Sequence, residues 1–155
     1  LARARRGAIA VEYALLAVPF FTILLAIIET GYIFFAAILI EGATAEAARQ
    51  IRTGAVQGSN APLAQFRAIL CNSLFGVVPC GDLVIDVRNF TRFADANTPP
   101  IAGNTFAPGA AGDVVVVRVA YQWSFITPLL NRALSNAAGN TRSFVASAAF
   151  RNEPF

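Results

Sequence analysis

The sequence contains no histidine, no lysine and no methionine, and all twelve of its basic residues are arginine. Without histidine, no side chain titrates near neutral pH in its ordinary state, which excludes Ser–His–Asp and Cys–His catalysis. Without lysine, a Schiff-base nucleophile and a phosphate-loop lysine are excluded as well. The nine acidic residues are scattered along the chain. We therefore expect no enzymatic activity and no cofactor.

Cysteine is scarce, since Cys71 and Cys80 are the only two. Two cysteines without histidine are too few ligands for a zinc site, so we expect no metal. Their spacing is also not that of the redox motif with two intervening residues. The pair favours a structural disulfide if this part of the chain is exported, and two inert free thiols are the alternative.

Charge is sparse: charged residues make up 14% of the chain and hydrophobic residues 56%. An ordinary soluble domain has about a quarter charged residues. The net charge of +3 comes from Arg3, Arg5 and Arg6, because the chain after residue 7 has nine arginines and nine acids. A basic nucleic-acid-binding surface on the rest of the chain is therefore not indicated, and no nucleic-acid partner is expected.

A long apolar run follows the arginine cluster. From Ala14 to Ile40, Glu29 is the only charged residue among 27. About 20 apolar residues suffice to cross a bilayer, so the run predicts one transmembrane helix with the lipid bilayer as a partner. The run is too long for the apolar part of a cleavable signal. Because basic flanks stay cytoplasmic, we expect the N-terminus in the cytoplasm and the rest exported.

The helix is expected to continue beyond the membrane. Residues 41–52 are rich in helix formers, and Glu46 lies three residues before Arg49, a spacing that places both on one helix surface. This predicts a helix from Ala8 to about Thr53. Glu29 is costly in hydrocarbon and calls for a partner. We favour a lateral contact in an assembly, and the alternative is a protonated carboxyl bonded to its own helix.

The remaining chain predicts a small head. Asn60 is a plausible N-cap for a short amphipathic helix, with apolar residues at helical spacing. These are Leu63, Phe66, Ile69, Leu70 and Leu74. Segments of period two at Asp82–Phe90, Gly112–Trp123 and Thr141–Arg151 predict three antiparallel strands, in which Asp82 and Asp86 lie on a solvated face.

The expected fold class is α+β: a long transmembrane helix and stalk, a short helix and a small antiparallel sheet of about three strands. The expected organisation is a cytoplasmic leader (1–7), a transmembrane helix and stalk (8–57) and an exported head (58–155). Two long connections, Ala94–Ala111 and Thr127–Asn140, are expected to be loops that contact neighbours.

The residues from Arg6 to Tyr13 (Arg-Gly-Ala-Ile-Ala-Val-Glu-Tyr), directly before the apolar run, resemble the processing site of the tight-adherence (Tad/Flp) branch of type IV pilins. With Ile27-Ile28-Glu29-Thr30-Gly31 and the final Arg151-Asn152-Glu153-Pro154-Phe155, they are similar to TadE-like minor pseudopilins. The resemblance covers residues 6–53 and the extreme C-terminus.

The resemblance implies a pilin-like fold and cleavage by a prepilin peptidase of the bacterial inner membrane after Gly7. Ala8 would become the new N-terminus, and Glu12 and Tyr13 would form the branch's Glu-Tyr pair. Glu12 of a neighbouring subunit could pair with the new ammonium during assembly. The implied partners are the peptidase, the major and minor pilins and the inner-membrane assembly platform. The implied location is the inner membrane, with the assembled pilus as a second location.

Two functions are therefore consistent with the sequence. One is a structural subunit for pilus biogenesis and adhesion. The other is a single-pass, membrane-anchored periplasmic binding or sensing module, whose long loops would form a ligand site. The first requires Gly7 and Glu12, whereas the second should survive replacement of the membrane helix.

Overall fold

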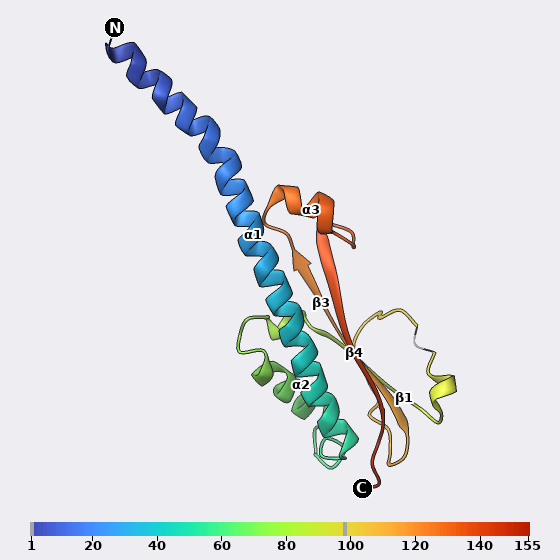
Figure 1. Ribbon diagram of the computed structural model, residues 1–155. Coiled ribbons are helices and arrows are strands. Elements are labelled where there is room, and N and C mark those ends of the chain that lie inside the picture. Colours follow the sequence, from blue (N-terminus) through green and yellow to red (C-terminus); the bar gives the residue numbers. More distant parts are fainter. Residues whose placement is uncertain (1, 98) are drawn as a thin grey trace. The chain divides into compact units, whose positions relative to one another are not determined.

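We describe the fold from a computed structural model, which describes residues 2–97 and 99–155, and the side chains of residues 7–97, 99–127 and 130–155. The fold is α+β, as predicted. The chain forms two compact units, Leu1–Phe34 with Ser124–Arg142, and Phe35–Trp123 with Ser143–Phe155, and each is described by itself. The α-helices and strands are α1 (Ala2–Arg52), α2 (Pro62–Ser73), β1 (Val84–Phe90), β2 (Thr105–Phe106), β3 (Val114–Ser124), α3 (Pro128–Leu134) and β4 (Thr141–Arg151). Figure 1 labels all of them except the two-residue β2.

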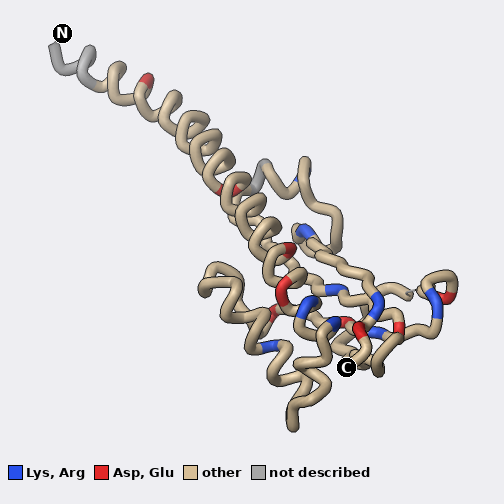
Figure 2. The backbone as a smooth tube through the Cα atoms, turned by 60° about the horizontal axis from the view of Figure 1, so that its bottom comes forward, with Lys and Arg blue, Asp and Glu red and all other residues tan. Residues whose placement is uncertain are grey.

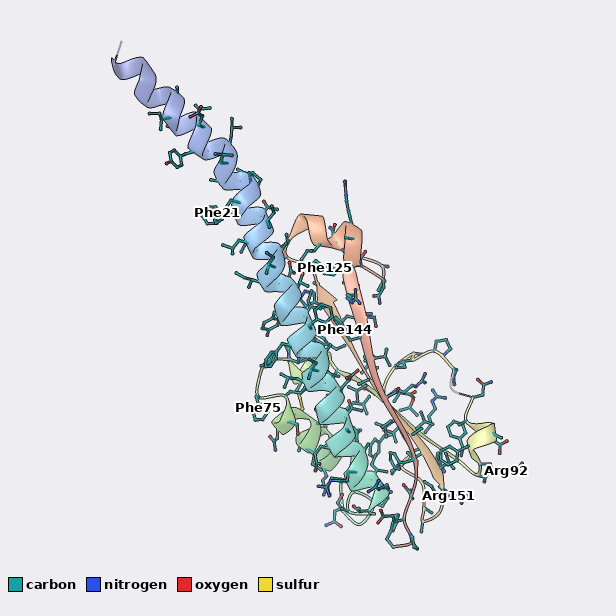
Figure 3. All side chains as sticks on the ribbon, viewed as in Figure 1. Phe21, Phe75, Arg92, Phe125, Phe144 and Arg151 are labelled. Carbon is teal, nitrogen blue, oxygen red and sulfur yellow. A yellow bond between two sulfur atoms is a disulfide. The ribbon has the colours of Figure 1, made fainter. Side chains whose placement is uncertain are left out.

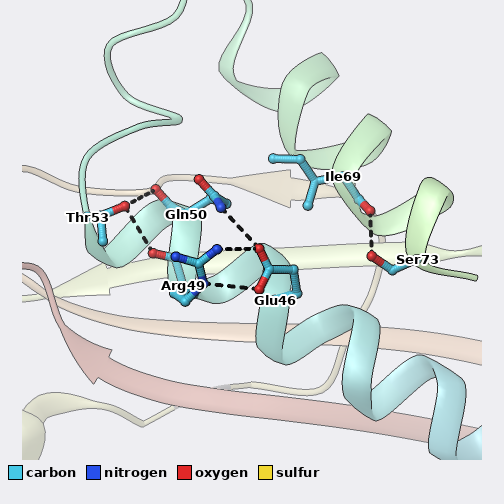
Figure 4. A network of polar contacts seen from close by, with 6 residues as sticks. All are labelled: Glu46, Arg49, Gln50, Thr53, Ile69 and Ser73. Carbon is cyan, nitrogen blue, oxygen red and sulfur yellow. Dashed lines mark hydrogen bonds and ion pairs between the residues drawn. The ribbon is translucent and has the colours of Figure 1, made fainter.

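Helix α1 is unbroken from Ala2 to Arg52 and spans about 77 Å at 1.5 Å per residue. Its C-terminal end lies within one residue of the predicted limit. Glu46 and Arg49 lie on one surface of α1, as their spacing indicated, and Arg49 donates to Glu46 through Nη2 at 2.7 Å and Nε at 3.0 Å (Figure 4). This bond, with a second from Gln50, lowers the pKa of Glu46 to about 2.

The second unit is built around a sheet with the strand order β2-β1-β3-β4. Strand β1 is antiparallel to β3, with Asp86 directly opposite Arg118. One face of the sheet packs on the end of α1 and on α2, so that alternate residues of β1 and β3 are fully buried, as the period-two pattern predicted. The core includes Ala36, Ile40, Ala43, Ala47, Ile51, Phe66, Leu70, Ile85, Val87, Val115, Val117, Val119 and Ala146.

The sheet differs from the prediction in having four strands and a mixed direction. Strand β2, only two residues long, runs parallel to β1. Asn104 adds a side-chain bond to the same edge, since Ile85 N donates to its Oδ1 at 2.9 Å. A two-residue strand carries no periodicity, so the sequence of the predicted loop Ala94–Ala111 did not indicate it.

The predicted N-cap Asn60 would start a helix at residue 61, but helix α2 begins one residue later, at Pro62. The N-cap is Ala61, without a side-chain cap bond, and Pro62 fills the first turn, so the prediction of Asn60 as N-cap is wrong. Phe66 and Leu70 are buried, and the ring of Phe66 lies 5.4 Å from that of Phe106. Cys71 at the end of α2 is joined to Cys80 in a disulfide with a Cα–Cα distance of 5.8 Å. For a loop of this size the bond stabilises the fold by about 2 to 3 kcal/mol.

The first unit combines the N-terminal part of α1 with the segment from Ser124 to Arg142. The region Thr127–Asn140 was expected to be an unstructured loop but contains helix α3. Pro128 in the first turn preorganises that helix, and Arg142 Nη1 donates to the carbonyl of Leu134 at 3.1 Å at its C-terminal end. We call residues 125–140 the α3 loop.

Candidate functional site

The predicted processing residues lie on an open part of α1. Gly7, Ala8, Glu12 and Tyr13 are all exposed, and Tyr13 is 74% exposed. A Cβ added to Gly7 would meet no atom within 4 Å. Packing in this chain therefore does not explain why position 7 is glycine. The side chains of Arg3, Arg5 and Arg6 in the predicted leader lie outside the described residues.

The Gly7–Ala8 peptide bond is helical in this structure. A protease binds its substrate in an extended form, so cleavage here would require the first two turns of α1 to unwind. Glycine in a helix costs about 1 kcal/mol relative to alanine, so Gly7 makes that unwinding easier.

After Tyr13 the first half of α1 carries almost no charged residue, as the nearly all-tan tube in Figure 2 shows. Many large apolar side chains are more than half exposed, including Leu16, Val18, Phe21 and Ile27 (Figure 3, Phe21). Among the described residues, one helix, Gly7–Arg52, is long and apolar enough to cross a membrane, with a mean hydropathy of 2.4 in its most apolar window. Only 22% of that window is buried, whereas the core helix of a soluble protein would be mostly buried.

A removable signal sequence also fits poorly with α1. The C-terminal part of the same helix supplies Ala36, Ile40 and Ile51 to the core of the second unit, where each is at most 1% exposed. Removing α1 would take these side chains out of the core, at a cost of several kcal/mol. The helix fits a single-pass anchor that stays attached to the domain it helps to build.

Glu29 lies on the apolar part of α1 but is only 7% exposed. Its Oε1 accepts a hydrogen bond from the backbone N–H of Ile126 at 2.7 Å, and its Oε2 accepts one from Thr127 at 2.9 Å. Both donors belong to the same unit as Glu29. The sequence allowed two explanations for Glu29, a contact with another subunit and a bond to its own helix, and neither included the backbone of residues 126 and 127. A contact of Glu29 with another subunit stays a prediction.

The local sequence explains why these two amides are available. Thr127 is the N-cap of α3 and makes no side-chain cap bond, and the following Pro128 has no N–H. Helix N-termini leave their first N–H groups without intrahelical partners, and a carboxylate is a favourable acceptor there. Glu29 therefore anchors the backbone at the start of α3, although it lies 97 residues before Ile126 in the sequence.

The α3 loop is also closed on itself. The backbone N–H of Phe125 donates to the carbonyl of Asn140 at 3.3 Å, and Ala137 forms a bridge with Thr141. Figure 3 labels Phe125 at the start of this segment. Because these bonds join the two ends of the α3 loop, it is a closed, hairpin-like element, and Glu29 connects it to α1.

Asp86 was predicted to be solvated on β1, and this prediction is wrong. Its side chain is 1% exposed and accepts bonds from Nε of Arg88 and Nε of Arg118, each at 2.9 Å. Arg118 also donates to the carbonyl of Pro99 at 2.8 Å, so the connection after β1 is bonded to the outer face of the sheet. An arginine interrupting the valine run of β3 was the available signal for this buried pair.

A groove lies between the end part of α1 and β4. It has a volume of about 290 Å³ and is lined by Glu41, Thr44 and Ala45 with residues 145–148. Ligand pockets generally have volumes of about 300 to 1,000 Å³, so the groove is at the lower limit. Within the described part of the chain, no three His, Cys, Asp or Glu side chains come together as a metal site.

Comparison with known proteins gives one family. The model of the TadE-like protein family matches residues 7–49. No curated protein and no solved structure matches the chain. The family match agrees with the resemblance seen in the sequence and suggests an association with a tight-adherence pilus.

Proposed function

We propose that this chain is a minor pseudopilin of a tight-adherence pilus, an assembly subunit anchored in the bacterial inner membrane by α1. Its N-terminus lies in the cytoplasm and its head outside, where the disulfide can persist. A prepilin peptidase cuts after Gly7, and the mature chain joins the major and minor pilins and the assembly platform in building a fibre for adhesion. The observation that carries this proposal is the family match, whose first residue is Gly7.

The geometry around Gly7 supports this reaction. The peptide bond after Gly7 is exposed, carries no side chain on its N-terminal side and lies at the weak end of a helix. Cleavage would create an ammonium at Ala8, one helical turn from Glu12. The Glu12 carboxylate is exposed and can pair with an ammonium, that of its own Ala8 or that of a neighbouring subunit.

The test is the N-terminus of the protein purified from membranes of cells with and without the peptidase. We expect a start at Ala8 only when the peptidase is present. Gly7→Leu should abolish this cleavage, because the larger side chain would clash in the protease site. Gly31→Leu is the matched control, since Gly31 lies on the same helix and a Cβ there also meets nothing within 4 Å. An N-terminus that does not depend on the peptidase would contradict the proposal.

The alternative, a membrane-anchored binding or sensing module, draws less support. The groove beside β4 is small, and the connection after β1 is held to the sheet by Arg118 and Asn104. Replacing residues 8–28 by an unrelated apolar helix separates the two functions. A sensing module would keep its activity, whereas a pseudopilin would no longer support pilus formation.

A further inference from the structure

We propose that the α3 loop rests in the lipid headgroup layer on the outer face of the membrane and that Glu29, by holding this loop, sets the depth at which α1 crosses. This proposal rests on the proposed function in one respect, that α1 spans a membrane. It assigns a lipid-binding role to residues 125–140 and a positioning role to Glu29.

The α3 loop is unsuited to hydrocarbon. It contains Arg132, which is exposed, and an arginine at the centre of a bilayer costs about 3 kcal/mol on insertion scales. Outside the short α3, the loop belongs to no helix or strand, and each of its backbone groups that is left unsatisfied in lipid costs several kcal/mol. Because two bonds tie the loop to Glu29, the hydrocarbon must end near Glu29.

The length of α1 before Glu29 fits a bilayer. Residues Ala8–Ile28 form 21 residues of continuous helix, which rise about 32 Å. The hydrocarbon layer is about 30 Å thick. This part of α1 therefore crosses without any residue after Glu29, with Glu12 near the cytoplasmic boundary. The inferred span differs from the run Ala14–Ile40 that hydropathy indicates, because the sequence does not show that the α3 loop is bound halfway along that run.

The outer surface of the α3 loop is suited to the headgroup layer. Ile126 is 83% exposed although its neighbour Thr127 is only 6% exposed, so an apolar side chain projects from an anchored backbone. Ile27 and Ile28, next to Glu29 on α1, are also exposed, by 65% and 59%. Lipid that covers these two residues is therefore adjacent to the loop. Arg132 can reach anionic headgroups, an attraction worth about 1 kcal/mol.

Depth-dependent quenching tests this inference. Because the native cysteines are paired in the disulfide, single cysteines introduced at Leu16, Ile126 and Phe93 can be labelled selectively with an environment-sensitive fluorophore. The full chain is reconstituted in phosphatidylcholine–phosphatidylglycerol vesicles containing a quencher lipid, with its nitroxide either near the headgroup or near the chain end. Leu16 is an exposed site within the inferred span, and Phe93 is an exposed site of the second unit.

We expect the label at Leu16 to be quenched most by the deep quencher, the label at Ile126 by the shallow quencher, and the label at Phe93 by neither. If Leu16 is quenched and Ile126 behaves like Phe93, the lipid contact of the loop is overturned while the membrane span stands. If Ile126 is quenched as deeply as Leu16, the boundary at Glu29 is overturned. If Leu16 is not quenched, the membrane span of the proposed function fails.

The role of Glu29 is tested by a second variant. Glu29→Ala removes the acceptor of both amide bonds, so shallow quenching at Ile126 should fall at least about twofold while quenching at Leu16 is kept. Glu41→Ala is the matched control, because it makes the same change at an exposed carboxylate of α1 outside this contact. Equal quenching at Ile126 in both variants would overturn the positioning role.

Discussion

Asp86 and Arg118 form a charge pair on the outer face of the sheet that almost no solvent reaches. Asp86 is 1% exposed and the Arg118 side chain 12% exposed, and the two residues are directly opposite in the β1–β3 register. Pairing of this kind contributes little by itself, because desolvation opposes the attraction. Removing one partner of the pair is costly, since the remaining charge stays largely shielded from water.

We predict that Asp86→Asn destabilises the fold by about 3 kcal/mol, because it leaves Arg118, whose side chain is only 12% exposed, without this counter-charge. Urea denaturation of the detergent-solubilised chain measures this. Asp82→Asn is the control, since Asp82 is exposed at the start of the same region and should change the free energy of unfolding by less than about 0.5 kcal/mol. Equal effects of the two substitutions would mean that the ion pair does not matter for stability.

At the scale of elements, the end of α1 depends on Gly54. This residue has a φ of +78°, and its N–H donates to the carbonyl of Ile51 at 3.0 Å, so it ends the helix in the left-handed conformation. The ring of Phe155 packs directly against its Cα, where a Cβ would collide with it. The backbone N–H of Glu153 also donates to the carbonyl of Arg52, the last residue of α1.

Gly54→Ala should therefore lower the free energy of unfolding by more than about 1 kcal/mol, through both backbone strain and displacement of Phe155. Thermal unfolding followed by circular dichroism is a suitable measurement. Gly58→Ala provides the comparison, because a Cβ there meets its nearest atom at 3.7 Å. A neutral Gly54→Ala would show that the packing of Phe155 contributes nothing to the end of α1.

The elements also show what could be predicted locally. The C-terminal end of α1 and the bounds of strands β1, β3 and β4 agree with the sequence patterns to within about two residues, because each pattern is long. The start of α1 does not agree, since the helix begins at Ala2, six residues before the predicted start at Ala8. Strand β2 and helix α3 were missed. Each is short, and each is held by distant groups: β2 by its pairing with β1, and α3 by Glu29.

For the molecule as a whole, three carboxylates of the second unit have lowered pKa values. Burial alone would raise the pKa of Asp86, but hydrogen bonds from Arg88 and Arg118, with their charges, more than offset this. The pKa of Glu46 is lowered to about 2 by Arg49 and Gln50. The N–H of Ala110 and the side chain of Asn89 lower the pKa of Asp113. Each carboxylate therefore binds its proton less readily in the folded state than in the unfolded state.

Stability linked to a lowered pKa is fully present above the unfolded pKa, near pH 4, and is lost as pH falls through the folded value. Because the chain has no histidine, we expect constant stability from about pH 5 to pH 8 and a steep loss below about pH 4. Urea midpoints measured across this range test the expectation. The loss should be shallower in Asp86→Asn, and a decline between pH 5 and 8 would contradict the assignment.

The sequence by itself determined the features that depend on local pattern: the long apolar helix, the three long strands, the pairing of Cys71 with Cys80, and the segment around Gly7 that matches the TadE-like family. Only the tertiary structure decided which charges are buried and which segment Glu29 holds. Those depend on contacts between residues 32 and 97 positions apart. Periodicity reports which face of an element is apolar, but it carries no information about what covers the opposite face.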